Sequence, residues 1–423
     1  MQITLLPPRE IGGTVYLPAS KSLSNRALII TALSQRGRAF DEEALGTLQN
    51  VSDCDDTQVM MAALREQPET VNVQAAGTAM RFLTAYLSVT PGTHFITGTE
   101  RMRHRPIAPL VDALRQLGVR IDYMGDEGFP PLRIGGNGVR GGELELPGGV
   151  SSQYISALLM IGPILEDGLT LHLTGQVVSR PYIDMTLEVM RHYGAQAQWS
   201  DERTIRVIGG GYNLTPYYIE SDWSASSYWY EVIALSPDPN ARIVLPGLFR
   251  KSLQGDNAVQ RIFRPLGVET QFIHDADGLE GVVLQKAPVQ IRQLSLDFAN
   301  QPDLAQTLVV TCTMLDIPFC FTGLQSLKIK ETDRMAALRT ELSKLGYKLR
   351  EEQGSVLRWD GERIPAQPDA AIDTYEDHRM AMAFAPACLR TGAIRINEPQ
   401  VVSKSYPAFW SDLKKIHFEV EGA

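Results

Sequence analysis

The stretch LPASKSLSNRALII at residues 17–30 joins an apolar helix to a polar and cationic first turn. Its second half, from Ala27 to Ile30, predicts a buried helix. Its first turn carries hydroxyls and cations, namely Ser20, Lys21, Ser22, Ser24 and Arg26. A helix N-terminus already bears a partial positive charge, so cations there favour a nearby anion, held by N–H groups, hydroxyls and cations together. A solvated helix start capped by Ser20 is the alternative.

Composition places the chain among ordinary globular proteins. Its 423 residues are 44% hydrophobic and 21% charged, which is enough for two or three domains with full cores. The net charge of −9 argues against nucleic acid or an anionic membrane as the main partner. The four cysteines have no metal-ligand spacing and suit a reduced compartment. With no signal peptide and no apolar run of membrane-spanning length, we expect a cytoplasmic protein.

A polar loop followed at once by an apolar helix recurs six times. The segments are PASKSLSNRALIITAL, AAGTAMRFLTAYLS, GGVSSQYISALLMIGPI, SDWSASSYWYEVIAL, NQPDLAQTLVVTCTML and TYEDHRMAMAFAPACL. They start about 70–80 residues apart, except for a first interval of about 57. Between them, alternating segments such as GGELELPGG and TIRVIGGG predict strands. Repetition at a fixed period indicates an α/β protein built by duplication, with three units in each domain.

A second kind of helix follows in several units. Examples are PIAPLVDALRQLGV, PYIDMTLEVMRHYGA, QGDNAVQRIFRPLGV and ETDRMAALRTELSKLGY, and each ends at a glycine in a C-cap-like position. In the last of these, Met335, Leu338, Leu342 and Leu345 mark one buried face.

Cations cluster where these units or their second helices begin. They are Lys21, Arg26, Arg81, Arg105, Lys330, Arg334, Arg379 and Lys404. Each alone is explained by a solvated face or a salt bridge, and Lys330 and Arg334 would share one helix face. Eight at equivalent helix starts instead predict a cleft for two anionic ligands, or for one ligand with two anionic groups.

Four side chains are candidates for proton transfer: Asp303, Glu331, His378 and Lys21. Asp303 has no neighbouring cation in sequence, and a helix N-cap is its structural alternative. Glu331 lies between Lys330 and Arg334, a placement that suits a general acid. His378 is equally typical of a satisfied structural histidine. The sequence contains no Walker A, HExxH or GxSxG motif, which excludes the chemistries that depend on them.

Nine strings in order resemble the 5-enolpyruvylshikimate-3-phosphate synthase family. They are SKSLSNRAL, GTAMRFL, RMRHRPI, SSQYISALLM, SRPYIDMTL, LQGD, KIKETDRM, YEDHRMAMAF and KSYPAF, and they span nearly the whole chain. The resemblance implies a two-domain inside-out α/β barrel of six βαβαββ-type units. It implies a discontinuous domain I at 1–20 and 223–423, a domain II at 21–222, and an active site in the interdomain cleft.

The resemblance also implies a reaction. The enolpyruvyl group of phosphoenolpyruvate is transferred to the 5-hydroxyl of shikimate 3-phosphate, and phosphate is released, as a step of chorismate and aromatic amino acid biosynthesis. Neither a metal nor an organic cofactor is implied. The expected partners are these two small-molecule substrates, without nucleic acid or membrane, and a monomer is expected.

Site residues follow from the resemblance, position by position. Shikimate 3-phosphate would contact Lys21, Ser22, Arg26, Ser151, Ser152, Gln153, Ser179, Tyr182, Asp303, Ser326 and Lys330. Phosphoenolpyruvate would contact Lys21, Gly77, Arg105, Gln153, Arg334, Arg379 and Lys404. Asp303 matches the residue that accepts the hydroxyl proton and Glu331 the one that protonates the enol methylene carbon, with Lys21 and His378 as further catalytic candidates.

The chain departs from the family pattern at three places. The usual NAGTAMRP reads AAGTAMRF, so Ala75 and Phe82 flank the phosphoenolpyruvate pocket and bear on glyphosate sensitivity. Ser326 stands where the family often has Asn. The connection before Gly77 is about twenty residues shorter than usual, which predicts a missing strand hairpin and a shortened first unit.

Two alternative functions remain, one an enzyme with a different acceptor and the other a non-catalytic binding protein. An enolpyruvyl transferase acting on UDP-N-acetylglucosamine would place a cysteine in the loop that matches ERMRHRPIAPL, and this loop has none. A non-catalytic anion-binding paralogue would be expected to lose Asp303 or Glu331, and both are present.

Overall fold

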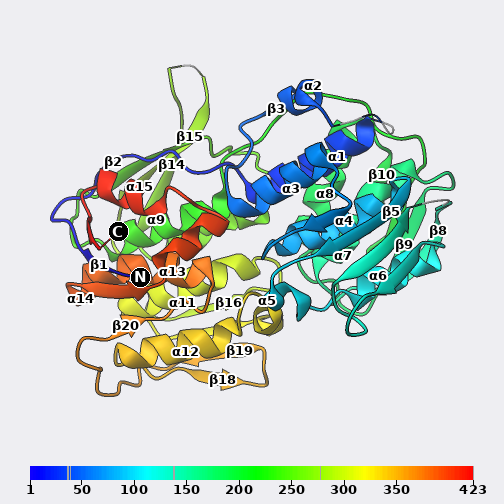
Figure 1. The fold of residues 1–423 in the computed structure, drawn as a ribbon. Helices are drawn as coiled ribbons and strands as arrows, with labels where there is room; N and C mark the ends of the chain where they lie inside the picture. Colours follow the sequence, from blue (N-terminus) through cyan, green and yellow to red (C-terminus); the bar gives the residue numbers. More distant parts are fainter. Residues whose placement is uncertain (36–37, 39, 137–138, 277, 423) are drawn as a thin grey trace. The chain divides into compact units, whose positions relative to one another are not determined.

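The computed structural model describes residues 1–35, 38, 40–136, 139–276 and 278–422. The chain forms two compact units (Figure 1). Unit 1 comprises Met1–Pro18 and Glu220–Ala423, and unit 2 comprises Ala19–Ile219. The first strand of the chain, β1 (Gln2–Leu6), therefore pairs with strands near the C-terminus, β21 (Ile394–Asn397) and β22 (Glu419–Glu421).

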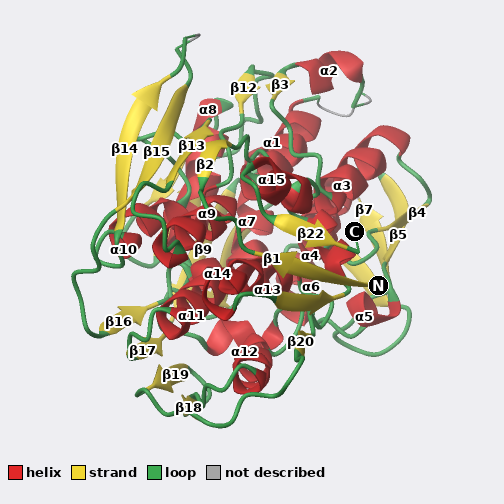
Figure 2. Ribbon diagram, turned by 90° about the vertical axis from the view of Figure 1, so that its left-hand side faces the viewer, coloured by secondary structure: helices red, strands yellow, loops and turns green. Residues whose placement is uncertain are grey.

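Unit 1 contains three four-stranded sheets, drawn in yellow in Figure 2. The first has the order β20 (Ala371–Ile372), β21, β1, β22. The second has the order β14 (Val268–His274), β15 (Glu280–Lys286), β13 (Arg242–Pro246), β2 (Gly12–Thr14). The third has the order β16 (Leu294–Asp297), β17 (Phe319–Thr322), β19 (Val356–Trp359), β18 (Arg350–Glu352).

Unit 2 contains two sheets of the same size and a smaller one. One has the order β4 (Thr70–Asn72), β5 (Gly92–Thr97), β7 (Leu132–Gly136), β6 (Arg120–Tyr123). Another has the order β10 (Ala197–Trp199), β11 (Thr204–Val207), β9 (Leu169–Thr174), β8 (Gly142–Pro147). The smaller sheet pairs β3 (Leu48–Gln49) with β12 (Tyr217–Tyr218).

The five four-stranded sheets share one pairing pattern. In each, one edge pair is parallel and the next two pairings are antiparallel, as in β4–β5, β5–β7 and β7–β6. The β3–β12 pair is parallel and, among the described residues, has no antiparallel strands added to it. β3 belongs to the first unit, which the sequence indicates is shortened, whereas its partner β12 lies at residues 217–218.

Three buried helices lie at the centre of unit 2. They are α1 (Lys21–Ser34), α4 (Gly77–Val89) and α7 (Ser152–Ile161), and they pack against one another. In α4 every residue from 77 to 88 is buried, which is expected of a helix that is apolar on all sides. Its internal hydroxyls need no outside partner, because Thr84 and Ser88 donate to the carbonyls of Met80 and Thr84, at 2.7 and 2.8 Å. The other helices of this unit are α2 (Glu42–Gly46), α3 (Asp55–Glu66), α5 (Glu100–Arg103), α6 (Ala108–Gln116), η1 (Gly162–Ile164) and α8 (Arg180–His192).

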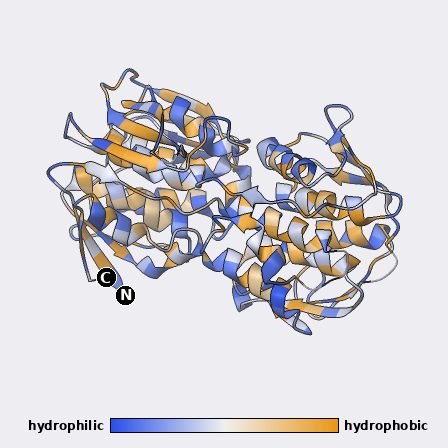
Figure 3. Cartoon of the chain, turned by 90° about the horizontal axis from the view of Figure 1, so that it is seen from above, coloured by the Kyte–Doolittle hydropathy of each residue, from blue (hydrophilic) through white to orange (hydrophobic). Residues whose placement is uncertain are grey.

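Unit 1 is organised in the same way around α9 (Trp223–Leu235), α11 (Ala305–Met314) and α13 (His378–Phe384). All residues of α11 and α13 are buried. The shorter and outer helices are η2 (Gly255–Ala258), α10 (Val259–Phe263), η3 (Pro302–Leu304), η4 (Gln325–Ile329), α12 (Arg334–Lys344), η5 (Ala385–Ala387), α14 (Cys388–Thr391), η6 (Pro399–Lys404) and α15 (Phe409–Lys415). Figure 3 shows hydrophobic residues, in orange, on helices and strands of both units.

The outer helices follow the sequence prediction. On α12 the side chains of Met335, Leu338 and Leu342 are buried, and Leu345, the C-cap, is half-buried. The four predicted C-terminal glycines all have positive φ, and they are Gly118, Gly194, Gly267 and Gly346. Gly118, Gly194 and Gly346 directly follow the C-caps of α6, α8 and α12, where glycine adopts the left-handed conformation without steric cost. The C-cap prediction is wrong for Gly267, because α10 ends at Phe263 with Arg264 as its C-cap.

No helix in the described part of the chain is long and apolar enough to cross a membrane. The four cysteines are free thiols, and burial raises the pKa of Cys312 and Cys388 above the usual thiol value.

Candidate active site

In unit 2, the first turn of α1 meets a carboxylate from a neighbouring helix. Nζ of Lys21 lies 3.2 Å from Oδ2 of Asp56 on α3, and the two side chains are 17% and 10% exposed. Ser20 caps the helix by accepting the N–H of Leu23. The chain thus supplies part of the negative charge that the cationic helix start requires. No pattern in the sequence indicates Asp56, because it lies 35 residues from its partner.

Arg26 is buried and binds three helices to one another. Its Nε donates to Oγ1 of Thr186 at 2.7 Å, Nη1 to the Ser22 carbonyl at 2.9 Å, and Nη2 to Oγ of Ser156 at 3.1 Å and to the Tyr182 carbonyl at 3.2 Å. A guanidinium has five N–H groups, so these bonds leave one on Nη1 for another partner. Burial lowers the pKa of Arg26 to about 10.

Phe82 covers one side of this guanidinium. Its fully buried ring lies 5.3 Å from the Cζ atom of Arg26, within the range of a cation–π contact. Phe82 is the residue at which the chain departs from the family's proline, so the departure contacts a predicted binding residue.

Two arginines converge on the first residue of α4. Nη1 of Arg81 donates to the Gly77 carbonyl at 2.8 Å. A Cβ atom at Gly77 would lie 2.7 Å from Nη1 of Arg81 and equally close to Nη1 of Arg105, so a larger residue here would force the two guanidinium groups to move. The Nε atom of Arg105 is buried and has no hydrogen-bond partner among the described residues. An anion at this helix start would meet two guanidinium groups and unpaired N–H groups.

The starts of α4 and α7 are joined by side chains. Nε2 of Gln153 donates to Oγ1 of Thr78 at 3.1 Å. Ser151 caps α7 by accepting the N–H of Gln153, and Ser152, its first residue, is buried. Gln153, Ser151 and Ser152 are all predicted site residues, and they lie at the same end of the central helices as Gly77.

Two further predicted residues lie at the start of α8. Ser179 precedes this helix with φ of 54° and is buried. The carbonyl of Tyr182 accepts hydrogen bonds from Arg26 and from Oγ1 of Thr186. The structure therefore brings the starts of α1, α7 and α8 together through Arg26.

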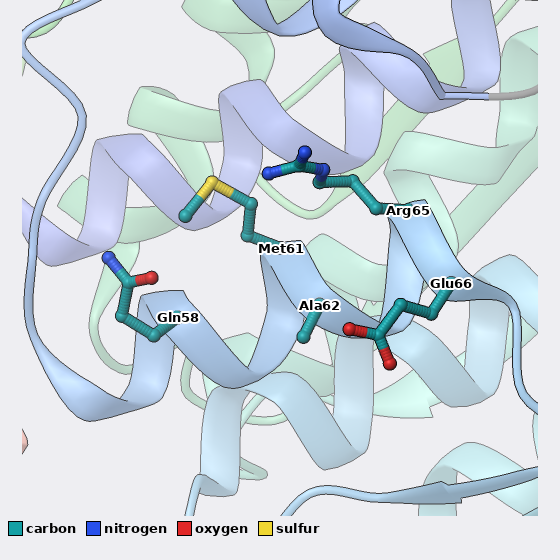
Figure 4. A pocket seen from close by; sticks show the side chains of 5 residues that line it. All are labelled: Gln58, Met61, Ala62, Arg65 and Glu66. Atoms are coloured by element: carbon teal, nitrogen blue, oxygen red, sulfur yellow. The ribbon is translucent and has the colours of Figure 1, made fainter.

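A hollow in unit 2 is lined by other residues. It is lined by Gln58, Met61, Ala62, Arg65 and Glu66 of α3 (Figure 4). None of these is a predicted site residue. Glu66 ends α3, so the hollow borders the connection that is shorter than in the family.

In unit 1, Asp303 is the centre of a group of cations. Its carboxylate lies 2.9 Å from Nη2 of Arg379, 3.4 Å from Nη1 of Arg334 and 3.9 Å from Nζ of Lys330. Burial favours the neutral acid, but the three cations outweigh it and hold the pKa of Asp303 well below its usual value. The N-cap alternative for Asp303 is wrong, because neither η3 nor α11 is capped by a side chain.

Arg334 connects both predicted proton carriers. It is 1% exposed, and its Nη2 donates to Oε2 of Glu331 at 2.7 Å while Nη1 contacts Asp303. Its Nε donates to Oδ2 of Asp377 at 2.7 Å. Burial opposes the charge of Arg334, but the three carboxylates outweigh it and raise its pKa.

The expectation that Lys330 and Arg334 share a helix face is wrong. Lys330 is the C-cap of η4, and α12 begins only at Arg334, after Asp333 caps it by accepting the N–H of Ala336. The two cations meet through Asp303 instead. Ser326, another predicted residue, is half-buried within η4.

The start of α13 carries the remaining predicted residues of unit 1. Oδ1 of Asp377 accepts the N–H of Arg379 at 2.9 Å and caps the helix. His378 is 2% exposed, with Nδ1 at 3.8 Å from Asp377. Arg379 also donates to the Asp303 carbonyl at 3.1 Å. Nζ of Lys404 donates to the Glu376 carbonyl at 3.3 Å.

Asp256 is another buried carboxyl in this region. Oγ of Ser224 donates to it, and burial together with the charge of Asp303 raises its pKa to about 7. Asp256 lies in LQGD, one of the strings that carry the resemblance, and its burial near Asp303 could not be read from the sequence.

Comparison with known proteins assigns the family. The model of EPSP synthase (3-phosphoshikimate 1-carboxyvinyltransferase) matches residues 5–67 and 66–413. The chain belongs to the EPSP synthase family. The 3-phosphoshikimate 1-carboxyvinyltransferase of Bacteroides fragilis (strain YCH46) is 56% identical over 421 residues, covering 100% of this chain and 99% of the relative. The enzyme of the same name from Sulfurovum sp. (strain NBC37-1) is 33% identical over 442 residues, covering 98% and 99%.

Solved structures show the same mixed α/β fold. EPSP synthase from Acinetobacter baumannii superposes with a TM-score of 0.76 at 21% identity, covering 99% of each chain. The enolpyruvyl transferase NikO from Streptomyces tendae superposes with a TM-score of 0.67 at 15% identity, covering 99% of this chain and 98% of that one. The family and the fold expected from the sequence are confirmed, and the chain is a transferase.

Proposed function

We propose that the chain transfers the enolpyruvyl group of phosphoenolpyruvate to the 5-hydroxyl of shikimate 3-phosphate, a step of chorismate and aromatic amino acid biosynthesis. The observation that carries this proposal is the pair of contacts made by Arg334, at 3.4 Å to Asp303 and 2.7 Å to Glu331. One guanidinium thereby holds a base and an acid beside a set of cations. Addition to a phosphorylated enol needs all three.

Asp303 is the proposed base and Glu331 the proposed acid. Glu331 gives its proton to the methylene carbon of phosphoenolpyruvate, the 5-hydroxyl oxygen bonds to the neighbouring carbon, and Asp303 takes the hydroxyl proton. The product is a tetrahedral ketal phosphate. Glu331 then takes a proton back from the methyl carbon, phosphate leaves with the proton that Asp303 had taken, and the double bond is restored. Lys21, Lys330 and His378 are proposed to stabilise the charge that develops.

The two substrates are assigned to two overlapping sets of residues. We assign shikimate 3-phosphate to Lys21, Ser22, Arg26, Ser151, Ser152, Gln153, Ser179, Tyr182, Asp303, Ser326 and Lys330. We assign phosphoenolpyruvate to Lys21, Gly77, Arg105, Gln153, Arg334, Arg379 and Lys404. Support comes from the two guanidiniums beside Gly77 and from the buried cations around Asp303. Arg26 acts mainly by fixing Ser22 and Tyr182, since most of its N–H groups are already bonded.

Units 1 and 2 are the proposed domains I and II, and we place the enzyme in the cytoplasm as a monomer. The bonds formed by the charged residues within each unit hold the site residues in place before substrate binds, which lowers the cost of ordering them.

Release of inorganic phosphate tests the proposal. Purified protein is given phosphoenolpyruvate alone, with shikimate 3-phosphate, or with UDP-N-acetylglucosamine. Release that requires shikimate 3-phosphate supports the proposal. Release that requires UDP-N-acetylglucosamine would assign the other acceptor, and no release with either would indicate a binding paralogue.

A further inference from the structure

The turn at residues 373–377 presents two groups, the Asp377 carboxylate and the Glu376 carbonyl, to the cationic cluster of unit 1. Asp377 accepts from Nε of Arg334 at 2.7 Å and from the N–H of Arg379 at 2.9 Å. The Glu376 carbonyl accepts from Lys404 at 3.3 Å. Of the residues assigned to phosphoenolpyruvate, the three cationic ones in unit 1 therefore all bind one short segment, Arg334 and Lys404 through their side chains and Arg379 through its backbone N–H. We call this segment the 373–377 turn.

The backbone of this turn is strained. Tyr375 and Glu376 both have φ of 54°, in the left-handed region that residues with a Cβ atom avoid. Two such residues in succession persist only where the surrounding structure determines their conformation. The turn itself contains no glycine that would relieve the strain.

A buried carboxylate on α12 holds the 373–377 turn in this conformation. Glu341 is 0% exposed, and its Oε1 accepts the hydroxyl of Tyr375 at 2.6 Å while its Oε2 accepts the N–H of Asp373 at 3.0 Å. Lys344 neutralises Glu341 at 2.7 Å and also reaches Oδ2 of Asp373 at 2.8 Å. Asn397 donates to the other oxygen of Asp373 at 2.7 Å.

One helix thus binds both ends of the turn. α12 begins with Arg334, which binds Asp377, and two turns later it presents Glu341 to Tyr375 and Asp373. A carboxylate that accepts short hydrogen bonds without contact with water fixes its partners more firmly than an exposed one.

We propose that Glu341 is a positioning residue for the phosphoenolpyruvate site. Acting through Tyr375, it holds the strained 373–377 turn in the conformation that places Arg334, Arg379 and Lys404. Glu341 touches no substrate in this role. The inference rests on the proposed function, because that function assigns these three cations to phosphoenolpyruvate.

The test compares Michaelis constants in folded variants. Tyr375→Phe removes only the hydroxyl, and the KM for phosphoenolpyruvate is expected to rise about tenfold, the size expected on losing a hydrogen bond to a charged group. The KM for shikimate 3-phosphate should stay within about twofold. Glu341→Gln should show the same selectivity. The double variant should be no more impaired than the more impaired single variant, because the two substitutions share the bond between Tyr375 and Glu341.

Tyr230→Phe is the matched control. Tyr230 is a buried tyrosine of the same unit, and its hydroxyl bonds to Oγ1 of Thr270 at 2.9 Å, away from the turn. Its loss should leave both Michaelis constants unchanged. Should Glu341→Gln fail to fold, Tyr375→Phe still carries the test.

Two results would overturn the inference. One is an unchanged KM for phosphoenolpyruvate in folded Tyr375→Phe, and the other is an equal rise of both Michaelis constants together with a lower melting temperature. Lys404→Ala distinguishes failure of the inference about Glu341 from failure of the proposed function. If Lys404→Ala leaves the KM for phosphoenolpyruvate unchanged, the assignment of the site is wrong; if it raises that KM and Tyr375→Phe does not, only the role of Glu341 is wrong.

Discussion

Asp303 and Arg379 are joined twice. Nη2 of Arg379 lies 2.9 Å from the Asp303 carboxylate, and Nη1 donates to the Asp303 carbonyl at 3.1 Å. With Arg334 and Lys330 also near, the low pKa keeps Asp303 ionised. A base bound this tightly becomes a good proton acceptor only when its cations turn toward another anion. Binding of an anionic substrate would supply that anion, so we expect substrate binding to activate Asp303.

Asp303→Asn should lower kcat by about 10²–10⁴-fold, because the amide keeps the shape but cannot accept the proton. The KM for shikimate 3-phosphate should change by only a few-fold. Steady-state phosphate release measures both. Asp360→Asn, a half-exposed carboxylate of the same unit, is the control. A variant with normal turnover would remove Asp303 from the mechanism.

Glu331→Gln should reduce turnover far more than affinity for shikimate 3-phosphate, since it removes a proton donor. Titration calorimetry gives the affinity and rapid-quench measurement gives the rate. Glu352→Gln, on strand β18, serves as the control at about half exposure. Equal losses of rate and affinity would instead indicate that Glu331 is a binding residue.

Phe82→Leu should destabilise the protein by about 1–2 kcal/mol, through lost packing and the lost cation–π contact with Arg26. Because Arg26 fixes Ser22 and Tyr182, the KM for shikimate 3-phosphate should rise as well. Phe298→Leu, another fully buried phenylalanine, should destabilise without affecting that KM. Identical kinetic behaviour of the two variants would show that Phe82 is only a core residue.

Glu220 should make stability fall as pH rises. Burial raises its pKa from 4.5 to about 7, although Ser252 donates to it at 2.6 Å. Its folded-state pKa exceeds the unfolded value, so its contribution is fully present below pH 4.5 and is lost as pH rises through about 7. Glu220→Gln removes this titrating group, so it should flatten the pH dependence of the melting temperature between about pH 5 and pH 8. Parallel curves for the two proteins would show that Glu220 does not titrate there.

Residue patterns sufficed for the features that depend on local sequence. The apolar helices that begin at 21, 77 and 152 are buried, three of the four predicted glycines follow a helix C-cap with positive φ, and the α12 face at Met335, Leu338 and Leu342 is internal. Periodicity and backbone preference act over a few residues, so they are visible in the sequence. The strings that carry the family resemblance are equally local.

Only the tertiary structure decided which charges meet. Asp56 reaches Lys21 across 35 residues, Asp377 reaches Arg334 across 43, and Asp303 gathers cations from two separate segments, at 330–334 and at 379. Lys330, expected on the helix of Arg334, lies before it because Asp333 caps that helix. By itself the sequence determined the helices, their ends and the types of residue placed there. Packing those helices against one another determined the partners, because Coulomb interactions depend on distance in space and burial strengthens them.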